Sequence, residues 1–429
     1  MKFTRVFAFM ALAGLAGSAY ATNGYFSHGY GMKAKGMAGA ATATHDDAFF
    51  GANNPAAAAF AGNRLDLGVD LFSPIREASR TGSTAFGPFP AISGTSESDS
   101  NYFLVPEFGY NRMVNNNLAL GVTVYGNGGM NTDYPQNQLG GNANLLGGST
   151  SLGVDLMQLI IAPTAAYKVA PNHSIGISPL LGYQRFKAEG LQGFEMITSS
   201  PGNVTNNGYD DAFGYGVRIG YMGKLTPTVT IGAAYASKMN FDEFDKYQGL
   251  FAEQGDFDIP ENYNIGVAWQ ATPQVKLALD YQRINYNDVA SVANASGPAA
   301  FACFMGDTTM CLGQDTGSGF GWQDMDIWKL GVEYKYSQQL TLRAGYSHTD
   351  QPIPNADVEF NILAPAVIED HVTLGLTYTL ASGNELTVAY MHGFKNDVTG
   401  PSLFFSPNGG TDKIEMYQNS LGIQYSWKM

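Results

Sequence analysis

Apolar and polar residues alternate with a period of two along almost the whole chain, and this pattern most constrains its fold. The segment 372–380 alternates Val372, Leu374 and Leu376 with threonine and glycine, and 420–427 repeats the pattern near the end of the chain. Successive residues of a β-strand point to opposite faces, so each segment has one apolar face and one small or polar face. The pattern predicts an all-β protein.

Fourteen segments are candidate strands, and the connections between them alternate in length. The segments are 65–73, 101–114, 117–126, 154–170, 173–189, 211–225, 228–238, 257–271, 275–289, 324–336, 340–350, 366–381, 384–396 and 413–429. Tight turns rich in Asn, Pro, Gly and Ser, the residues that turn geometry favours, join them at 114–117, 170–173, 225–228, 271–275, 336–340 and 381–384. The remaining connections are long loops.

Short turns on one side and long loops on the other are typical of bacterial outer-membrane barrels. An even number of strands closes the sheet and leaves no unpaired edge in lipid. A soluble sandwich would share the alternation of residues but not this alternation of loop lengths. The sequence therefore predicts a 14-stranded antiparallel transmembrane β-barrel over residues 64–429, in the outer membrane of a Gram-negative bacterium.

The first 21 residues predict a secretory signal peptide. Lys2 and Arg5 supply the positive end, 6–17 is apolar, and Ala19-Tyr20-Ala21 gives the small-x-small cleavage pattern. The apolar stretch is too short to cross a bilayer as a helix. We expect residues 1–21 to be removed on export.

Residues 22–63 break the strand pattern, because they are rich in glycine and alanine and poor in β-branched residues. A segment of this size before the first strand is expected to fold into the lumen as a hatch, or plug. The alternative is a disordered periplasmic tail, which its low charge and several aromatic residues disfavour. We expect Asn54, Pro55 and Ala56 to form the turn into the first strand, and Asp46 and Asp47 to bind basic groups of the lumen.

Composition and motifs exclude several classes of function. The chain carries 37 acidic and 23 basic residues, a net charge of −14, which disfavours nucleic-acid binding. No G-x-S-x-G, H-E-x-x-H or Walker motif occurs and the six histidines are scattered, so an enzyme such as a barrel-embedded hydrolase is disfavoured. We expect no cofactor and no metal. Cys303 and Cys311 predict a disulfide in an exported protein, since a zinc site would need four ligands.

Several motifs resemble the FadL/TodX family of outer-membrane channels for hydrophobic compounds. They are Thr22-Asn23-Gly24-Tyr25-Phe26, Gly36-Met37-Ala38-Gly39-Ala40, Asp46-Asp47-Ala48, Asn54-Pro55-Ala56, Val105-Pro106-Glu107-Phe108-Gly109-Tyr110 and Val122-Thr123-Val124-Tyr125-Gly126. The resemblance covers essentially the whole mature chain. It implies a 14-stranded barrel, an N-terminal hatch, and an inward kink in the third strand through which substrate leaves sideways into the membrane.

The resemblance also implies the substrates, which are long-chain fatty acids or aromatic and aliphatic hydrocarbons, taken up passively. The extreme N-terminus reaches a ligand pocket in the family, so Tyr25 and Phe26 are candidate substrate-binding residues, the alternative being simple hatch packing. The run Tyr125, Gly126, Gly128 and Gly129 fits either a loop start or a kink, and the resemblance favours the kink.

Two mid-strand prolines bear on the same kink, because proline cannot donate a ladder hydrogen bond. Pro106 and Pro163 are counted at about the same level as Tyr125, and we expect them to flank the lateral opening. The alternative is that they mark bulges without function.

Charges on the predicted inward faces form a third set of candidate residues. Five of them lie on the ninth to eleventh strands: Lys276, Asp280, Lys329, Glu333 and Arg343. They are expected to pair across the lumen and hold the hatch, or one basic residue receives a substrate carboxylate.

Exposed aromatic residues in the predicted external loops suit the capture of hydrophobic ligands. The candidates are Phe301, Phe304, Phe404 and Phe405, with self-packing of the loops as the alternative. The main alternative function is a diffusion porin for polar solutes. The expected partners are the substrate, membrane lipid, lipopolysaccharide and the outer-membrane insertion machinery, and we expect a monomer.

Overall fold

The structure is a computed structural model that describes residues 23–88, 90–136, 139 and 143–429. The predicted signal peptide, residues 1–21, lies outside the described residues. Within the part that is described, no helix is long and apolar enough to cross a membrane.

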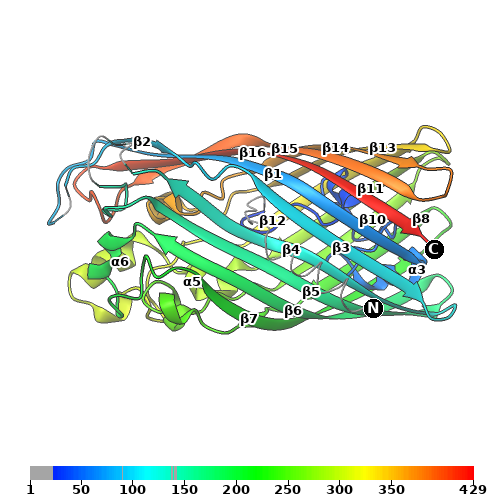
Figure 1. The fold of residues 1–429 in the computed structure, drawn as a ribbon, viewed down its shortest axis with the longest axis horizontal. Coiled ribbons are helices and arrows are strands. Elements are labelled where there is room, and N and C mark those ends of the chain that lie inside the picture. Colours follow the sequence, from blue (N-terminus) through cyan, green and yellow to red (C-terminus); the bar gives the residue numbers. More distant parts are fainter. Residues whose placement is uncertain (1–22, 89, 137–138, 140–142) are drawn as a thin grey trace.

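The described strands form one antiparallel sheet that closes on itself, and fourteen of them make a barrel (Figure 1). The barrel strands are β1 (Arg64–Thr81), β3 (Phe103–Met113), β4 (Leu118–Tyr134), β5 (Leu152–Ala170), β6 (His173–Glu189), β7 (Asp210–Lys224), β8 (Val229–Ala236), β10 (Asn262–Gln270), β11 (Val275–Ile284), β12 (Met325–Lys335), β13 (Leu340–Thr349), β14 (Asp370–Thr379), β15 (Glu385–Pro401) and β16 (Thr411–Lys428). Pairing of β1 with β16 closes the barrel. Two short strands, β2 (Gly94–Glu97) and β9 (Asn240–Phe241), pair with β1 and β7. The predicted 14-stranded antiparallel barrel is confirmed.

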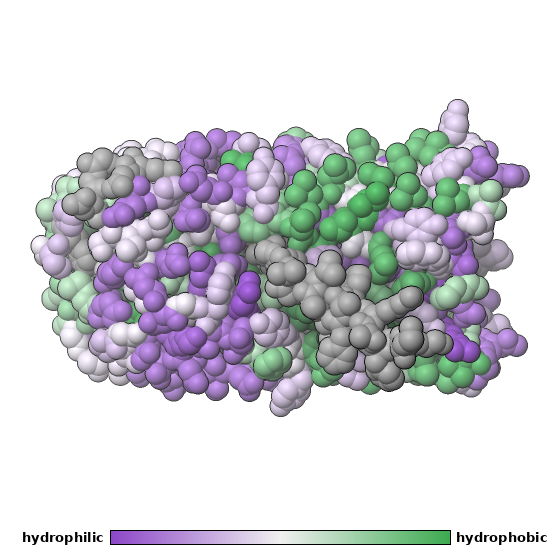
Figure 2. All heavy atoms as spheres, in the orientation of Figure 1, coloured by the Kyte–Doolittle hydropathy of each residue, from purple (hydrophilic) through white to green (hydrophobic). Residues whose placement is uncertain are grey.

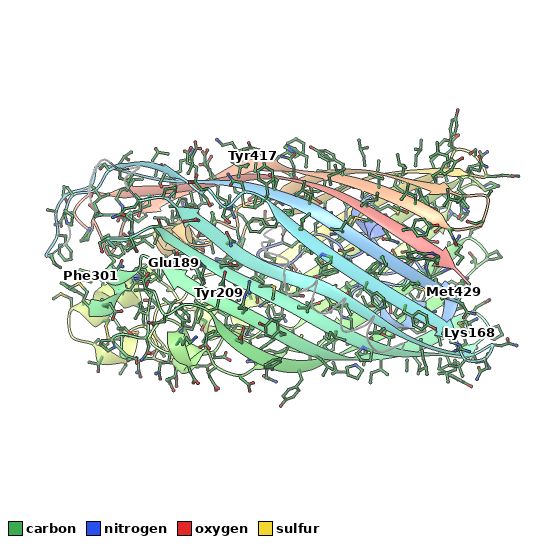
Figure 3. The ribbon with its side chains drawn as sticks, viewed as in Figure 1. Lys168, Glu189, Tyr209, Phe301, Tyr417 and Met429 are labelled. Atoms are coloured by element: carbon green, nitrogen blue, oxygen red, sulfur yellow. A yellow bond between two sulfur atoms is a disulfide. The ribbon has the colours of Figure 1, made fainter. Side chains whose placement is uncertain are left out.

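The two ends of the barrel differ, with short turns and the C-terminus at the right of Figure 1 and long loops at the left. Figure 3 places Phe301 at the long-loop end and Lys168 and Met429 at the other. The loops carry short helices: η2 (Gln192–Met196), η3 (Asp245–Tyr247), α4 (Ala252–Gly255), η4 (Tyr286–Asp288), α5 (Ala290–Ala293), α6 (Gly297–Phe304), η5 (Thr308–Met310), η6 (Asn355–Asp357) and η7 (Phe360–Ile362).

An apolar band covers the outer wall toward the short-turn end, and the long-loop end is mostly hydrophilic (Figure 2). Leu104, Leu181, Ile265 and Leu374 are among the exposed apolar side chains of this wall. Lipid covers such a band in an outer-membrane barrel, so the long-loop end is extracellular and the short turns are periplasmic.

Three strands extend beyond the C-terminal ends that the sequence pattern predicts, among them β15, which runs to Pro401 rather than to residue 396. The prediction ended β1 at residue 73 and β4 at residue 126, whereas the strands run to Thr81 and Tyr134. The upper part of β1 carries Glu77 and Ser79, which pair with Glu415 and Lys413 of β16. Because this part rises above the apolar band, its outward residues are polar and the alternation that marks a membrane strand disappears.

Candidate functional site

Residues 23–63, here called the hatch segment, lie almost entirely buried inside the barrel. The segment contains α2 (Met32–Lys35), η1 (Pro55–Ala57) and α3 (Ala58–Ala61). Lys35 of α2 makes ion pairs with Asp70 of β1 at 2.7 Å and with Glu107 of β3 at 2.8 Å. All three side chains are buried, so a charged cluster ties the hatch segment to the wall.

The predicted lumen charges contact the hatch segment or one another. The contacts are Lys276 with Asp46 at 2.5 Å and with Glu333 at 3.1 Å, Arg343 with Glu333 at 2.7 Å, the Asp280 carboxylate accepting from the N–H groups of Ala41 and Thr42 at 2.8 Å each, and Lys329 donating to the His28 carbonyl at 3.2 Å. This geometry fits the expectation that these groups hold the hatch segment. The Asp47 carboxylate, by contrast, accepts from the Phe49 N–H within the hatch segment itself.

The turn at Asn54-Pro55-Ala56 is fixed by the Asn54 side chain. Its Oδ1 accepts from the Ala56 N–H at 3.1 Å, and its Nδ2 donates to the carbonyls of Thr42 and Tyr221. Asn54 therefore caps η1 and joins it both to the hatch segment and to β7 of the wall.

A gap opens in the barrel wall between β3 and β4. The two strands pair from Met113 and Ala119 up to Phe108 and Val124, and no further. Above that level β3 pairs only with β1, while β4 stays paired with β5 up to Tyr134. Figure 1 shows β3 and β4 diverging toward the extracellular end.

A β-bulge marks the departure of β4 from the wall. The pairing of β4 with β5 shifts by one residue between Gly126 and Gly128, which leaves Asn127 as the extra residue. The residues from Asn127 to Met130 are all buried, so both faces of the strand are covered there. An extra residue of this kind bends the strand that contains it.

The hatch segment pairs with the edge of β4 that β3 leaves free. The Ser27 N–H donates to the Asn127 carbonyl at 3.0 Å, and the Gly129 N–H donates to the Tyr25 carbonyl at 3.1 Å. The backbones are so close that a Cβ on Gly128 would lie 1.7 Å from the Tyr25 carbonyl oxygen. The kinked strand and the start of the hatch segment thus form one hydrogen-bonded unit.

The two prolines lie at different breaks in the wall. Pro106 lies opposite Val69 of β1, in the part of β3 that has no partner on β4. The prediction that Pro163 also flanks this opening is wrong, because β4 remains paired with β5 at that level. Pro163 instead faces β6, where pairing is interrupted between Ile161 and Ala165, next to the position of Pro179.

An aromatic cluster surrounds the first residues of the hatch segment. The Tyr25 ring lies 5.2 Å from Tyr286, 5.9 Å from Phe257 and 5.9 Å from Trp322, and Phe26 lies 6.0 Å from Tyr286. The Tyr286 hydroxyl donates to the Asn23 carbonyl at 2.7 Å. Tyr25 and Phe26 are buried among these rings.

Three of the predicted external aromatic residues, Phe304, Phe404 and Phe405, lie in contact, and only part of the set is exposed. Phe301 is 39% exposed and Phe404 is fully buried. The Glu359 carboxylate accepts from the N–H groups of Phe404 and Phe405 at 2.8 and 2.9 Å. A disulfide joins Cys303 to Cys311 just after Phe301. Phe301 and, in part, Phe304 therefore meet solvent, whereas Phe404 and Phe405 do not.

Aromatic rings lead inward from this surface. Successive ring centres are separated by 5.9 Å from Phe304 to Phe404, 4.9 Å to Phe405, 5.7 Å to Phe194 and 4.8 Å to Phe360. Phe360 and Phe320 line a cavity of about 30 Å³. Phe320 lies 6.0 Å from Trp322. This aromatic path links the extracellular surface to the cluster around Tyr25.

Two carboxyl groups lie beside the Tyr25 cluster in an extracellular loop. Asp258 pairs with Lys238 at 2.7 Å, and the Asp256 Oδ2 has no hydrogen-bond partner. Burial, and then the neighbouring Asp258 carboxylate, raise the pKa of Asp256 to about 8.

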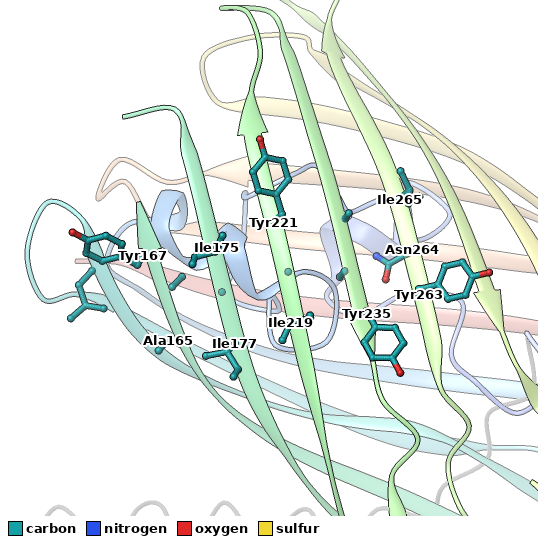
Figure 4. A pocket seen from close by; sticks show the side chains of 16 residues that line it. Ala165, Tyr167, Ile175, Ile177, Ile219, Tyr221, Tyr235, Tyr263, Asn264 and Ile265 are labelled. Atoms are coloured by element: carbon teal, nitrogen blue, oxygen red, sulfur yellow. The ribbon is translucent and has the colours of Figure 1, made fainter. Parts of the chain in front are cut away.

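A larger hollow, of about 770 Å³, lies on the outer wall (Figure 4). It is lined by apolar and tyrosine side chains of β5 to β10, among them Tyr167, Ile175, Ile219 and Tyr235. Tyr167, Ile175 and Ile219 are exposed side chains of the apolar band, so the hollow lies on the surface that faces lipid.

Sequence analysis did not identify Lys35, Tyr286 or Trp322 as site residues. Tyr286 and Trp322 lie in a long loop whose composition resembles that of the other loops. Only the fold brings Tyr286 to Tyr25, 261 positions away. Lys35 was missed because its partners, Asp70 and Glu107, lie on strands far from it in sequence.

Comparison with known proteins assigns the family. Residues 10–402 match the family of outer-membrane transport proteins described as OMPP1/FadL/TodX. No curated protein matches the chain significantly.

Several solved structures share the fold. The toluene transporter TodX of P. putida superposes with a TM-score of 0.67 at 19% identity, covering 94% of this chain and 99% of that one. A FadL homologue of Pseudomonas aeruginosa gives 0.69 at 16% identity, with the same coverage of 94% and 99%. The monoaromatic hydrocarbon channel CymD gives 0.58 at 17%, covering 94% and 98%. On its barrel, its internal N-terminal segment and its match to the family, the chain belongs to the OMPP1/FadL/TodX family of outer-membrane transport proteins.

Proposed function

We propose that this protein carries hydrophobic compounds passively across the outer leaflet and releases them sideways into the membrane between β3 and β4. The observation that carries the proposal is the departure of β4 from β3 above Val124, with Tyr25 and Ser27 of the hatch segment hydrogen-bonded to the freed edge. Displacement of those hatch residues would uncover the gap. The opening would then face the lipid hydrocarbon.

The route to the gap is apolar. A ligand captured near Phe301 would follow the aromatic path past Phe194 and Phe360 to Trp322 and Tyr25. Release into lipid keeps the molecule out of water, which saves about 0.8 kcal/mol for each CH₂ group. The substrates in the names of the structural relatives, toluene and other monoaromatic hydrocarbons, fit such a route, and so do long-chain fatty acids. A diffusion porin for polar solutes would need an open polar lumen, whereas the hatch segment fills this one.

Deletion of Asn127 tests the proposal. Removing the extra residue of the bulge straightens β4 and lets it continue alongside β3, which closes the gap. We expect uptake of radiolabelled oleate and toluene by cells expressing this variant to fall to the level of cells without the protein. Entry of a polar sugar serves as a control for general leakage.

The matched control is Asn127→Ala. It removes the Asn127 side-chain hydrogen bonds to Tyr30 and Gln158 but keeps the bulge, so uptake should remain. Normal uptake by a folded, membrane-inserted deletion variant would contradict lateral release. Sugar entry that depends on the wild-type protein, without oleate or toluene uptake, would indicate a porin instead.

A further inference from the structure

Arg76 projects from the inward face of β1 to the extracellular end of the gap. Its side chain is buried, with 3% of the residue exposed. The guanidinium donates hydrogen bonds to the carbonyl of Asn131 on β4 and to the carbonyl of Ser100, and it reaches the Ser98 hydroxyl at 3.3 Å. Arg76 thus bridges β1, β4 and the segment after β2, around the rim of the gap.

The positive charge of Arg76 lacks a counter-charge. Arg80, on the same face of the same strand, pairs with Asp412 at 2.6 Å and Glu359 at 3.1 Å. Among the residues that the structure describes, no carboxylate oxygen lies within 4.0 Å of Arg76, and its Nε has no hydrogen-bond partner. A buried charge without a paired opposite charge is costly, so Arg76 is a candidate to bind an anion.

Arg76 also lines a small cavity that is otherwise mostly apolar. The cavity measures about 20 Å³, and its lining includes Phe72, Met130, Trp322 and Met416. Trp322 is the last ring of the aromatic path, and Met130 belongs to the kinked part of β4. A molecule that follows the path with its tail among the rings therefore meets one cation, next to the gap.

Two other buried cations, Arg218 and Lys329, have no ion pair within 4.0 Å in the described chain, but their surroundings differ. Arg218 donates to the carbonyl of Ala52 and Lys329 to that of His28, both in the hatch segment. They line a polar cavity with Asp280. Their charges hold the hatch segment, whereas Arg76 contacts only the wall and the rim of the gap.

We propose that Arg76 binds the acidic head group of the transported molecule at the rim of the gap, and that the protein therefore prefers long-chain carboxylic acids to uncharged hydrocarbons. This inference rests on the proposed function. A carboxylate supplies the missing counter-charge and forms charge-assisted hydrogen bonds with the guanidinium. The same N–H groups now hold the carbonyls of Asn131 and Ser100, so a bound carboxylate competes with the contacts that close the rim.

Equilibrium binding to the purified full-length protein tests the inference, with radiolabelled oleate and its uncharged ester methyl oleate as probes. Wild type should bind oleate more tightly than methyl oleate, and Arg76→Gln should weaken oleate binding about tenfold or more while changing methyl oleate binding little. Arg76→Lys, which keeps a cation, should retain part of the preference. Arg185→Gln is the charge-matched control, because Arg185 stacks on Tyr209 at 4.1 Å outside the lumen.

Two results would overturn the inference. The first is that Arg76→Gln still binds oleate more tightly than methyl oleate, or that wild type shows no such preference. The second is an equal loss of both ligands in Arg76→Gln, which would make Arg76 a purely structural bridge. Either result leaves the proposed function standing if wild-type cells still take up toluene. If wild-type cells take up neither oleate nor toluene, the proposed function itself fails.

Discussion

At the scale of single residues, Gly128 is the position where the wall and the hatch segment leave least room. We predict that Gly128→Ala breaks the two backbone hydrogen bonds between β4 and the hatch segment, because its Cβ would fall 1.7 Å from the Tyr25 carbonyl oxygen. The loss should be about 1–3 kcal/mol for two hydrogen bonds. Hydrogen–deuterium exchange measures this loss, because the amides of residues 23–29 should exchange faster in Gly128→Ala than in wild type.

Gly68→Ala is the control for this substitution. Gly68 also lies in a barrel strand, but the nearest atom to its added Cβ is 3.6 Å away, an ordinary contact. In Gly68→Ala, hydrogen–deuterium exchange at residues 23–29 should therefore match that of wild type. Equal protection in Gly128→Ala and wild type would mean that the hatch segment is not held by β4.

At the scale of elements, the hatch segment is attached through buried charges as well as through apolar contacts such as those of Phe50 and Met37 with the wall. Its short helix α2 places Lys35 between Asp70 and Glu107. Such a cluster is strong only while it is complete, because removing one partner leaves the others buried and uncompensated.

We predict that Lys35→Met weakens the docking of the hatch segment by about 3–5 kcal/mol, the usual effect of breaking a buried ion pair. Limited proteolysis within residues 23–63 should become faster. The triple variant Lys35→Met, Asp70→Asn, Glu107→Gln removes all three charges together and should recover most of the protection. If Lys35→Met resists protease as well as wild type, the charged cluster does not hold the hatch segment.

At the scale of the whole molecule, the barrel does not need the hatch segment to close, because the wall is closed by pairing of β1 with β16. We predict that deleting residues 23–61 turns the protein into an open pore. Liposomes containing the folded variant should swell in a sugar solution, whereas liposomes with the full protein should not. No swelling by a variant that still shows the heat-modifiable migration of a folded barrel would mean that the loops close the lumen.

Much of the barrel could be predicted from sequence because lipid demands apolar residues at every second outward position. That demand ends above the membrane, which is why the upper part of β1 was missed. The end of β4 was missed for another reason, because both faces of the strand are buried beyond the bulge at Asn127. Pro163 was assigned to the wrong opening. Counting residues from the turn gives the height of a residue in the wall, but it does not show on which side of its strand the pairing is interrupted.

The lumen was less predictable, because its contacts join distant segments. Lys35 finds Asp70 and Glu107, and Tyr25 finds Tyr286 and Trp322, only once the barrel encloses the hatch segment. Inward-facing charges could be recognised on the strands, but the sequence contains no signal for which of them lacks a partner. Arg76 and Arg80 look alike in sequence, and only the fold distinguishes them.

The seam between β1 and β16 also bears on how the molecule assembles. It joins residues 64–81 to residues 411–428, a contact of very long range in sequence, and such contacts form late in folding. The hatch segment immediately precedes β1, and its backbone lies so close to the wall glycines Gly128 and Gly232 that neither has room for a side chain. The hatch segment must therefore reach its place while the sheet is still open, and closing the seam traps it inside.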